Sequence, residues 1–172
     1  MFEETNEELL RKYQKGNFKA FKIFYDRNSK LIYYYLMIRL RSQSVAEDLL
    51  QESFLKMHKN IMRYDPSKKA LPWLFTITRN TLIDYVRKSK EISHENMDIF
   101  SEETAENFEQ KEELEEILGA LPLEERKLIE DRFLKDKSYE EIAAQNYSSL
   151  SATRKRVSRI LEKLRLSFAR SR

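Results

Sequence analysis

Glycine and proline are scarce in this chain, whose 172 residues include two glycines and three prolines. Tight hairpin turns and glycine-built phosphate loops both need residues that adopt unusual backbone angles, and this chain has few such residues. Apolar residues recur instead at the three- and four-residue spacings of amphipathic helices. The sequence therefore predicts an all-α protein.

The N-terminal half has the periodicity of four helices. They are expected over residues 7–27 with an interruption near Gly16, and over 29–42, 44–62 and 73–89. Ser44 is the expected N-cap of the third helix, because Glu47 lies three residues further on and completes a capping box. Pro66 and Pro72 delimit a polar, basic loop, "DPSKKALP", before the fourth helix.

The C-terminal half opens with weak periodicity and many acidic residues over 91–110, which predicts a linker with partial order at best. Helical patterns return at 111–121, 123–134, 138–146 and 148–168. Ser138 and Glu141 form a second expected capping box at the start of the short third helix. This helix, a brief turn and the long last helix have helix-turn-helix order.

Charge is unevenly distributed, although the net charge is only +3. Basic residues dominate from Lys56 to Lys90, acidic residues occupy 91–110 without any Lys or Arg, and basic residues return from Arg154 to Arg172. Two basic helical bodies joined by an acidic strap suit a polyanion that is held at two places. Solvation of two basic surfaces is the alternative interpretation.

Two basic segments are candidates for nucleic-acid binding. The last helix is expected to expose, at its groove-facing start, Ser151, Ala152, Thr153, Arg154, Lys155 and Arg159, whose cations reach phosphates and guanine edges. In the middle segment, basic residues alternate with the aromatic residues Tyr64, Trp73, Phe75 and Tyr85. Most of these rings are expected in the core, whereas the proline-bounded loop can shape a pocket for one extruded base.

The stretch "AEDLLQESF" places three polar groups on one helix face. Asp48, Gln51 and Glu52 follow the i, i+3, i+4 spacing, while Leu49, Leu50 and Phe54 are expected to point toward a core. From the residues alone, a solvated helix surface is the common interpretation of such a cluster.

Enzymatic chemistry has little support in the sequence. Cysteine is absent, and the two histidines, His58 and His94, lie outside any metal-spaced cluster. We therefore expect no catalytic residue, metal or cofactor. The acidic N-terminus lacks an apolar signal core, and the longest apolar run, "LIYYYLMI", is too short to span a bilayer, so a cytoplasmic protein without membrane contact is expected.

The segments "AEDLLQESFLKMHKNI" and "YDPSKKALPWLFTITRNTLIDYVRK" resemble region 2 of the bacterial extracytoplasmic-function (ECF) sigma factors. The segment "LEEILGALPLEERKLIEDRFLKDKSYEEIA", followed by "SRILEKLR", is similar to their region 4. The resemblance implies two small helical domains, a region 2 bundle at 1–90 and a region 4 helix-turn-helix at 113–172, joined by a flexible acidic linker at 91–112. It implies an alternative sigma factor that directs promoter-specific initiation by core RNA polymerase.

The resemblance also implies roles for individual residues. Asp48, Gln51 and Glu52 would dock on the clamp helices of the largest catalytic subunit of the polymerase, whose flap region is a further expected contact. Duplex and single-stranded promoter DNA would be bound at the −10 element by Lys68, Lys69, Trp73, Arg79, Asn80, Arg87 and Lys88. The −35 element would be bound by Ser151, Thr153, Arg154, Lys155, Arg156 and Arg159. An anti-sigma factor is a further expected partner.

The sequence departs from the family pattern at the helix-turn-helix. Tyr147 and Ser148 stand where the family usually has a glycine followed by an apolar residue, and Thr153 replaces a small apolar residue. Either Tyr147 adopts the left-handed conformation, at a cost of roughly 1–2 kcal/mol, or Asn146 adopts it and the turn shifts by one residue. A stand-alone helix-turn-helix regulator and a helical protein-interaction module are the rival functions.

Overall fold

The computed structural model describes residues 4–40, 42–92, 112 and 115–170. Within these ranges the regular secondary structure is entirely helical, as the sequence predicts. The chain divides into two compact units, an N-terminal unit, Met1–Asn107, and a C-terminal unit, Phe108–Arg172. None of the described helices is long and apolar enough to cross a bilayer.

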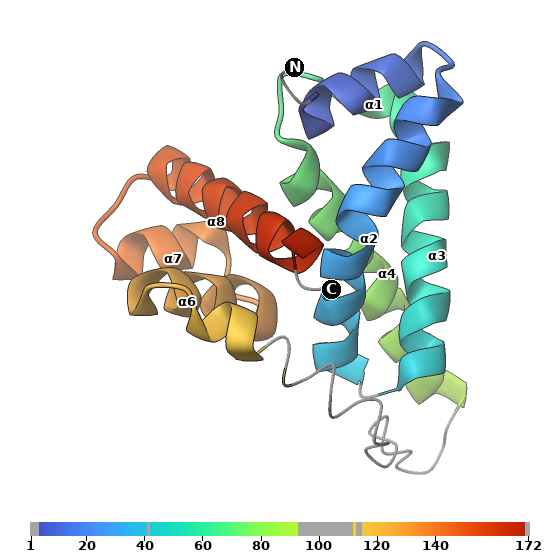
Figure 1. Cartoon of the computed structure of the whole chain (residues 1–172). Coiled ribbons are helices and arrows are strands. Elements are labelled where there is room, and N and C mark those ends of the chain that lie inside the picture. The colour runs from blue at the N-terminus through green and yellow to red at the C-terminus, as the bar shows by residue number, and fades with distance from the viewer. Residues whose placement is uncertain (1–3, 41, 93–111, 113–114, 171–172) are drawn as a thin grey trace. The chain divides into compact units, whose positions relative to one another are not determined.

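The N-terminal unit is a helical bundle. It contains α1 (Asn6–Gln14), α2 (Phe18–Leu40), α3 (Gln43–Lys59) and α4 (Ala70–Ile92). α2 and α3 run side by side, α4 packs against both, and α1 lies across one end of this group (Figure 1). The largest fully buried side chains of this bundle are Leu9, Leu10, Phe24, Ile32, Leu36, Leu40, Met57, Leu71 and Leu74. Each contributes roughly 1.5–3 kcal/mol by its burial, so this core determines which faces of α3 and α4 stay outside.

The boundary between α1 and α2 lies where the sequence predicts an interruption. Gly16 has a φ of +88°, which glycine adopts without a clash from a side chain. α2 then continues to Leu40, so the separate helix predicted at 29–42 is wrong. The buried Asn28 in its middle donates a hydrogen bond to the carbonyl oxygen of Phe24 (2.6 Å) and exchanges two with the side chain of Asn6 (3.2 and 3.3 Å).

The start of α3 differs from the prediction. The helix begins at Gln43, and Ser42 occupies the N-cap position without a capping hydrogen bond from its side chain. The predicted capping box of Ser44 and Glu47 is therefore wrong, because Ser44 is already inside the helix. Glu47 accepts a hydrogen bond from Gln43 instead (3.1 Å).

The connection from α3 to α4 has the predicted length but lies three residues earlier in the chain. α3 ends at Lys59 and is followed by a 3-10 turn, η1 (Ile61–Arg63). α4 begins at Ala70 rather than at Trp73. Pro72 therefore lies in the first turn of the helix, where its missing N–H would have had no helical partner.

The C-terminal unit is built around its last helix. It contains a helical stretch at 115–119, α6 (Leu123–Ile129), the π-helical η2 (Glu130–Leu134), α7 (Tyr139–Gln145) and α8 (Leu150–Arg170). The single helix predicted over 123–134 thus changes type at Glu130. The predicted capping box of Ser138 and Glu141 is confirmed. So is the buried stripe of α8, which consists of Val157, Ile160, Leu161, Leu164 and Phe168. Of the predicted linker, residues 91 and 92 belong to α4 and residue 112 is helical, while the rest lies outside the described residues.

Candidate functional site

The polar cluster on α3 forms an exposed ridge. Asp48, Gln51 and Glu52 are all exposed, and Leu55 lies on the same face with 58% of its surface accessible. Glu52 pairs with Lys56 of the next turn (2.9 Å), whereas Asp48 and Gln51 form no hydrogen bond or ion pair with the described residues. The sequence alone did not single out Leu55, although its spacing from Asp48 and Gln51 contains the signal. We call Asp48, Gln51, Glu52 and Leu55 the α3 ridge.

The loop between η1 and α4 has a fixed internal structure. The Asp65 carboxylate accepts hydrogen bonds from the backbone N–H and the hydroxyl of Ser67 (2.9 and 2.8 Å). The backbone hydrogen bond is the main reason that the pKa of Asp65 lies below its ordinary value. The Tyr64 hydroxyl donates to the carbonyl oxygen of Lys68 (2.6 Å). Lys68 and Lys69 are exposed, so the loop presents two cations on an ordered backbone.

The aromatic residues near this loop divide into core and partly open positions. Tyr64 and Phe75 are buried, as expected for most of these rings. Trp73 is half-buried, and its ring lies against that of Tyr64 with centroids 4.7 Å apart. Trp73 is therefore the ring beside the loop that combines partial exposure with rigid support.

The predicted −10 residues of α4 do not all share one face. At about 100° per residue, Trp73, Asn80, Arg87 and Lys88 fall within one arc of roughly 100° on the helix surface. Arg79 lies about 100° away from Asn80, on the flank of this arc. The structure thus brings four of the predicted α4 residues to one face and separates Arg79 from them.

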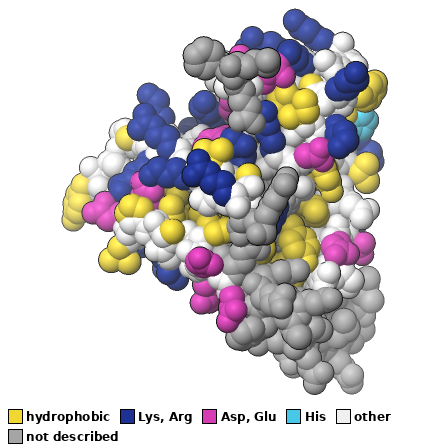
Figure 2. Space-filling view, in the orientation of Figure 1, with side chains coloured by type: hydrophobic (Ala, Val, Ile, Leu, Met, Phe, Trp, Pro, Cys, Tyr) yellow, Lys and Arg dark blue, Asp and Glu magenta, His cyan; other side chains and the backbone are white. Residues whose placement is uncertain are grey.

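The exposed side of α8 carries a basic line opposite its buried stripe. Ser151, Lys155 and Arg159 recur every four residues along the centre of this side, and all three are exposed. Neither Lys155 nor Arg159 forms a hydrogen bond or ion pair with the residues that the structure describes. Figure 2 shows Lys and Arg side chains gathered over α8. This line is the part of α8 best placed to meet a polyanion.

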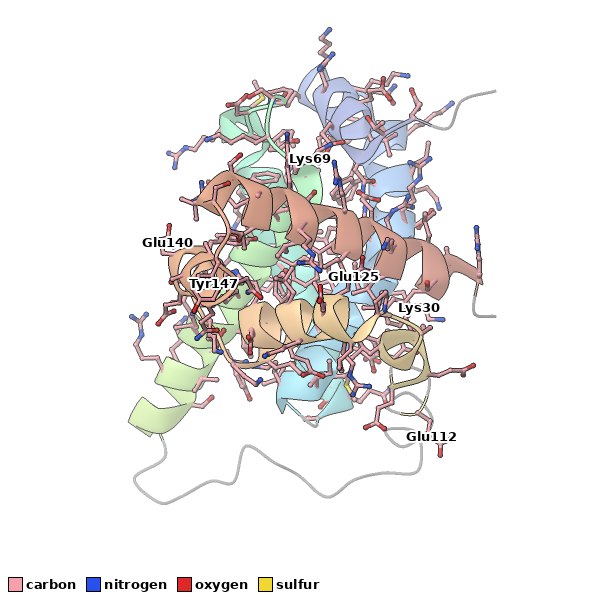
Figure 3. All side chains as sticks on the ribbon, turned by 90° about the vertical axis from the view of Figure 1, so that its left-hand side faces the viewer. Lys30, Lys69, Glu112, Glu125, Glu140 and Tyr147 are labelled. Atoms are coloured by element: carbon pink, nitrogen blue, oxygen red, sulfur yellow. The ribbon has the colours of Figure 1, made fainter. Side chains whose placement is uncertain are left out.

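Cations on the flanks of α8 pair with acidic residues of the same unit. Arg156 contacts Glu124 of α6 (2.8 Å), and Arg154 lies 3.8 Å from Glu140 of α7. Lys163 contacts Glu125, whose side chain points from α6 toward α8 (2.7 Å; Figure 3). Pairs that are this exposed contribute little to stability. They nevertheless neutralise the flanks and leave the central line as the most basic part of the helix.

Thr153 does not lie where the sequence predicts. It is 2% exposed, and its hydroxyl contacts that of Ser148 (2.7 Å) and donates to the carbonyl oxygen of Ser149 (3.1 Å). The prediction that Thr153 lies on the exposed, groove-facing start of the helix is therefore wrong. Its hydroxyl instead fastens the turn to the first turn of α8.

The turn of the helix-turn-helix is made by Tyr147, with a φ of +48°. Asn146 has a φ of −100°, so the alternative in which Asn146 is left-handed is wrong. The Tyr147 side chain is fully exposed and projects from the turn (Figure 3).

An ion cluster fixes the segment between η2 and α7. The buried Asp131 carboxylate contacts the ammonium groups of Lys135 (3.0 Å) and Lys137 (3.2 Å). Burial raises the pKa of Asp131, but hydrogen bonds from these two lysines outweigh it, and the pKa lies below its ordinary value. The Arg132 guanidinium lies 4.5 Å from the centre of the Tyr139 ring. These contacts hold the start of α7 against η2.

His58 has a structural contact. Its Nδ1 is hydrogen-bonded to the hydroxyl of the buried Tyr13, and this contact links α3 to α1. His94 lies outside the described residues. The described residues contain no group of three or more side chains arranged to hold a metal ion.

Comparisons with known proteins give one family match within each compact unit. Residues 24–92 match the family model of Sigma-70 region 2, and residues 117–166 match that of Sigma-70, region 4. The ECF RNA polymerase sigma factor SigM of Bacillus subtilis (strain 168) is 35% identical over 117 residues, which cover 64% of this chain and 71% of SigM. The RNA polymerase sigma factor CarQ of Myxococcus xanthus is 28% identical over 162 residues, covering 91% and 93%.

Among solved structures, CnrH in complex with the cytosolic domain of CnrY aligns with a TM-score of 0.48 and 21% identity, over 92% of this chain and 94% of that one. The two matched regions cover more than half of the chain, in the order in which the two basic surfaces occur. Together with the similarity to SigM, they show that this chain belongs to the ECF group of RNA polymerase sigma factors, which direct transcription initiation at promoters.

Proposed function

We propose that this sigma factor divides its work between residues 1–90, which bind core polymerase and the −10 element, and residues 113–172, which bind the −35 element. An acidic linker at 91–112 connects the two. The two separate basic surfaces support this division, because each belongs to a different compact unit. The chain itself catalyses no reaction and uses no cofactor, and it works in the cytoplasm beside the polymerase.

The α3 ridge is the proposed contact with the clamp helices of the polymerase. The observation that carries this assignment is the exposure of Asp48 and Gln51, whose side chains have no partner among the described residues, around the exposed Leu55. Carboxylate and amide oxygens accept charge-assisted hydrogen bonds from Arg and Lys. Leu55 adds exposed apolar surface, whose burial on docking would contribute to the affinity.

In the N-terminal unit, Lys68 and Lys69 of the loop and the Trp73–Asn80 face of α4 would bind the −10 element. Flipping a base out of the duplex costs a few kcal/mol, which a close-fitting pocket and phosphate contacts offset. Arg87 and Lys88 lie on the same face, where they suit contacts to the DNA backbone. Arg79 lies on the flank of this face of α4, a position that suits a contact with the upstream duplex or a contact that stabilises the fold.

In the C-terminal unit, Ser151, Lys155 and Arg159 are the central residues of the proposed −35 surface. Arg154 and Arg156 lie on its two sides and would exchange their acidic partners for phosphates. Thr153 is assigned to the fold rather than to DNA, because it is buried. An anti-sigma factor is a further proposed partner.

Transcription with purified core polymerase tests the assignment. We expect the Gln51→Ala/Glu52→Arg variant to bind core at least roughly tenfold more weakly, because it removes acceptors and adds a cation facing basic partners. Gln43→Ala/Glu47→Arg is the matched control, since it makes the same changes at the N-terminal end of α3, outside the α3 ridge.

Both variants should keep the helical circular dichroism signal of the parent. Equal affinity of the two variants for core would contradict the docking assignment. Run-off transcription from a promoter library, with this chain as the only sigma factor, separates the proposal from the rival functions, because a stand-alone regulator or an interaction module supports no specific initiation.

A further inference from the structure

The first turn of α4 is held by a residue of α1. The residue that precedes α4 is Lys69, whose ammonium group cannot accept a hydrogen bond from the free N–H groups of a helix start. The Glu7 carboxylate of α1 accepts one from the backbone N–H of Ala70 (3.0 Å) and lies 3.8 Å from the Lys69 ammonium. The Glu7 side chain is 18% exposed. An acidic residue 63 positions away thus takes the place of a local N-cap.

The other end of the loop is held by α1 as well. The Gln14 side-chain amide donates two hydrogen bonds, to the carbonyl oxygens of Ile61 (2.8 Å) and Tyr64 (2.7 Å). These two carbonyls lie immediately before the loop, and Ala70 lies immediately after it. Two side chains on one helix therefore fasten both ends of residues 65–69.

Tyr64 carries this support into the loop and onto Trp73. Its hydroxyl donates to the carbonyl oxygen of Lys68, and its ring lies against the Trp73 ring. Burial raises the pKa of Tyr64 far above its ordinary value, and the nearby Glu7 and Asp65 carboxylates raise it further. The phenol therefore stays protonated and keeps donating throughout the physiological range.

We propose that Glu7 and Gln14 are positioning residues for promoter recognition, which set the shape of the 65–69 loop and of the first turn of α4 without touching DNA. The inference rests on the proposed −10 function of that loop. A loop held in its binding conformation by its scaffold loses less conformational freedom when a base enters. Releasing either end would weaken binding of the correct strand more than of any other strand, because only the correct base uses the shaped pocket.

Isosteric substitutions separate the roles of the two residues. Glu7→Gln keeps an oxygen acceptor for the Ala70 N–H and loses only the charge beside Lys69, whereas Glu7→Ala loses both. Gln14→Glu keeps the shape of the side chain but removes both donors and places a carboxylate against two carbonyl oxygens. Gln43→Glu on α3 is the control for the added charge, because Gln43 contacts Glu47 and not the loop.

The experiment uses holoenzyme reconstituted from core polymerase and the full chain. Labelled non-template strands carry either a −10 sequence selected from the promoter library or its scrambled version, and fluorescence anisotropy gives the affinity ratio between them. We expect Glu7→Ala and Gln14→Glu to lower this ratio on the order of tenfold. Glu7→Gln and Gln43→Glu should stay within about twofold of the parent, and all four variants should bind core and −35 duplex as the parent does.

Each alternative outcome has a distinct meaning. A parent holoenzyme that binds both strands equally refutes the proposed −10 function and, with it, this inference. A parent that discriminates, with Glu7→Ala and Gln14→Glu discriminating equally well, refutes the inference alone. Loss of core binding in the same two variants also refutes it, because α1 would then support the whole N-terminal unit rather than the loop.

Discussion

Asp136 and Tyr147 are the described residues other than glycine with a positive φ, and Asp tolerates the left-handed conformation better than an aromatic residue does. A left-handed φ in a residue with a Cβ costs roughly 1–2 kcal/mol, and the fully exposed ring gains no packing in return. We expect Tyr147→Gly to raise the free energy of unfolding of the C-terminal unit by about 1 kcal/mol, as measured by urea denaturation of the full chain.

Asn146→Gly is the control for this substitution. Asn146 has a negative φ and donates a hydrogen bond to the carbonyl oxygen of Ile142 (2.8 Å), so glycine there should destabilise the unit. Equal stabilisation by both glycines would show that the turn does not strain Tyr147.

Residue-level predictions needed partners that are close in sequence, but closeness did not suffice, since the capping box predicted for Ser44 and Glu47 is absent. The capping box of Ser138 and Glu141 spans three residues and could be predicted, because the pattern contains both partners. The cap that Glu7 provides for α4 could not, because its partner lies 63 residues away. Thr153 was misplaced for a related reason, since helix spacing alone does not say which polar residue turns inward to bond the preceding turn.

At the level of elements, α8 presents one basic line, whose cations have no partner among the described residues, between two flanks with paired cations. We expect Lys155→Ala to weaken binding of −35 duplex and to reduce the slope of log K against log salt by about one, because one phosphate contact is lost. The holoenzyme, titrated at several salt concentrations, provides the measurement.

Lys163→Ala is the matched control on α8. Its ammonium group is paired with Glu125 and lies on the flank of the helix. Its substitution should change the salt slope by much less than one. A larger slope change for Lys163→Ala than for Lys155→Ala would show that the DNA-facing side of α8 has been assigned incorrectly.

Element boundaries were harder to predict than element types. The sequence predicts a helix for every α-helix of the N-terminal unit, but it divides α2 in two near Asn28. The sequence does not reveal that Asn6 pairs with this polar residue in the core. Proline both interrupts helices and fits their first turn, so the pattern around Pro72 does not reveal that α4 begins at Ala70. The apolar stripe of α8, by contrast, follows directly from its periodicity.

At the scale of the whole chain, one covalent connection joins the two proposed DNA-binding surfaces. Tethering can give the second contact an effective concentration on the order of millimolar. We expect a mixture of the fragments 1–107 and 108–172, each at micromolar concentration, to lose most promoter-specific initiation that the intact chain supports. Run-off transcription with core polymerase measures this loss.

Circular dichroism of each fragment provides the control for folding, since the cut lies between the two compact units. Full activity of the mixed fragments would show that the connection contributes nothing to initiation. The division into two units was predictable from the basic, acidic, basic order of charges. The family was predictable from the two resembling segments rather than from physical pattern alone.

The support that α1 gives to the 65–69 loop has a consequence for protein engineering. Residues 65–80 could be transplanted into another sigma factor in order to change its promoter choice. Such a graft moves the proposed −10 surface without the α1 residues that hold its shape. The recipient would also need an acid and an amide at the places of Glu7 and Gln14. A chimera that carries residues 65–80 together with Glu7 and Gln14 should recognise the donor's promoter. A graft of residues 65–80 alone should carry the donor's charges but not its promoter selectivity.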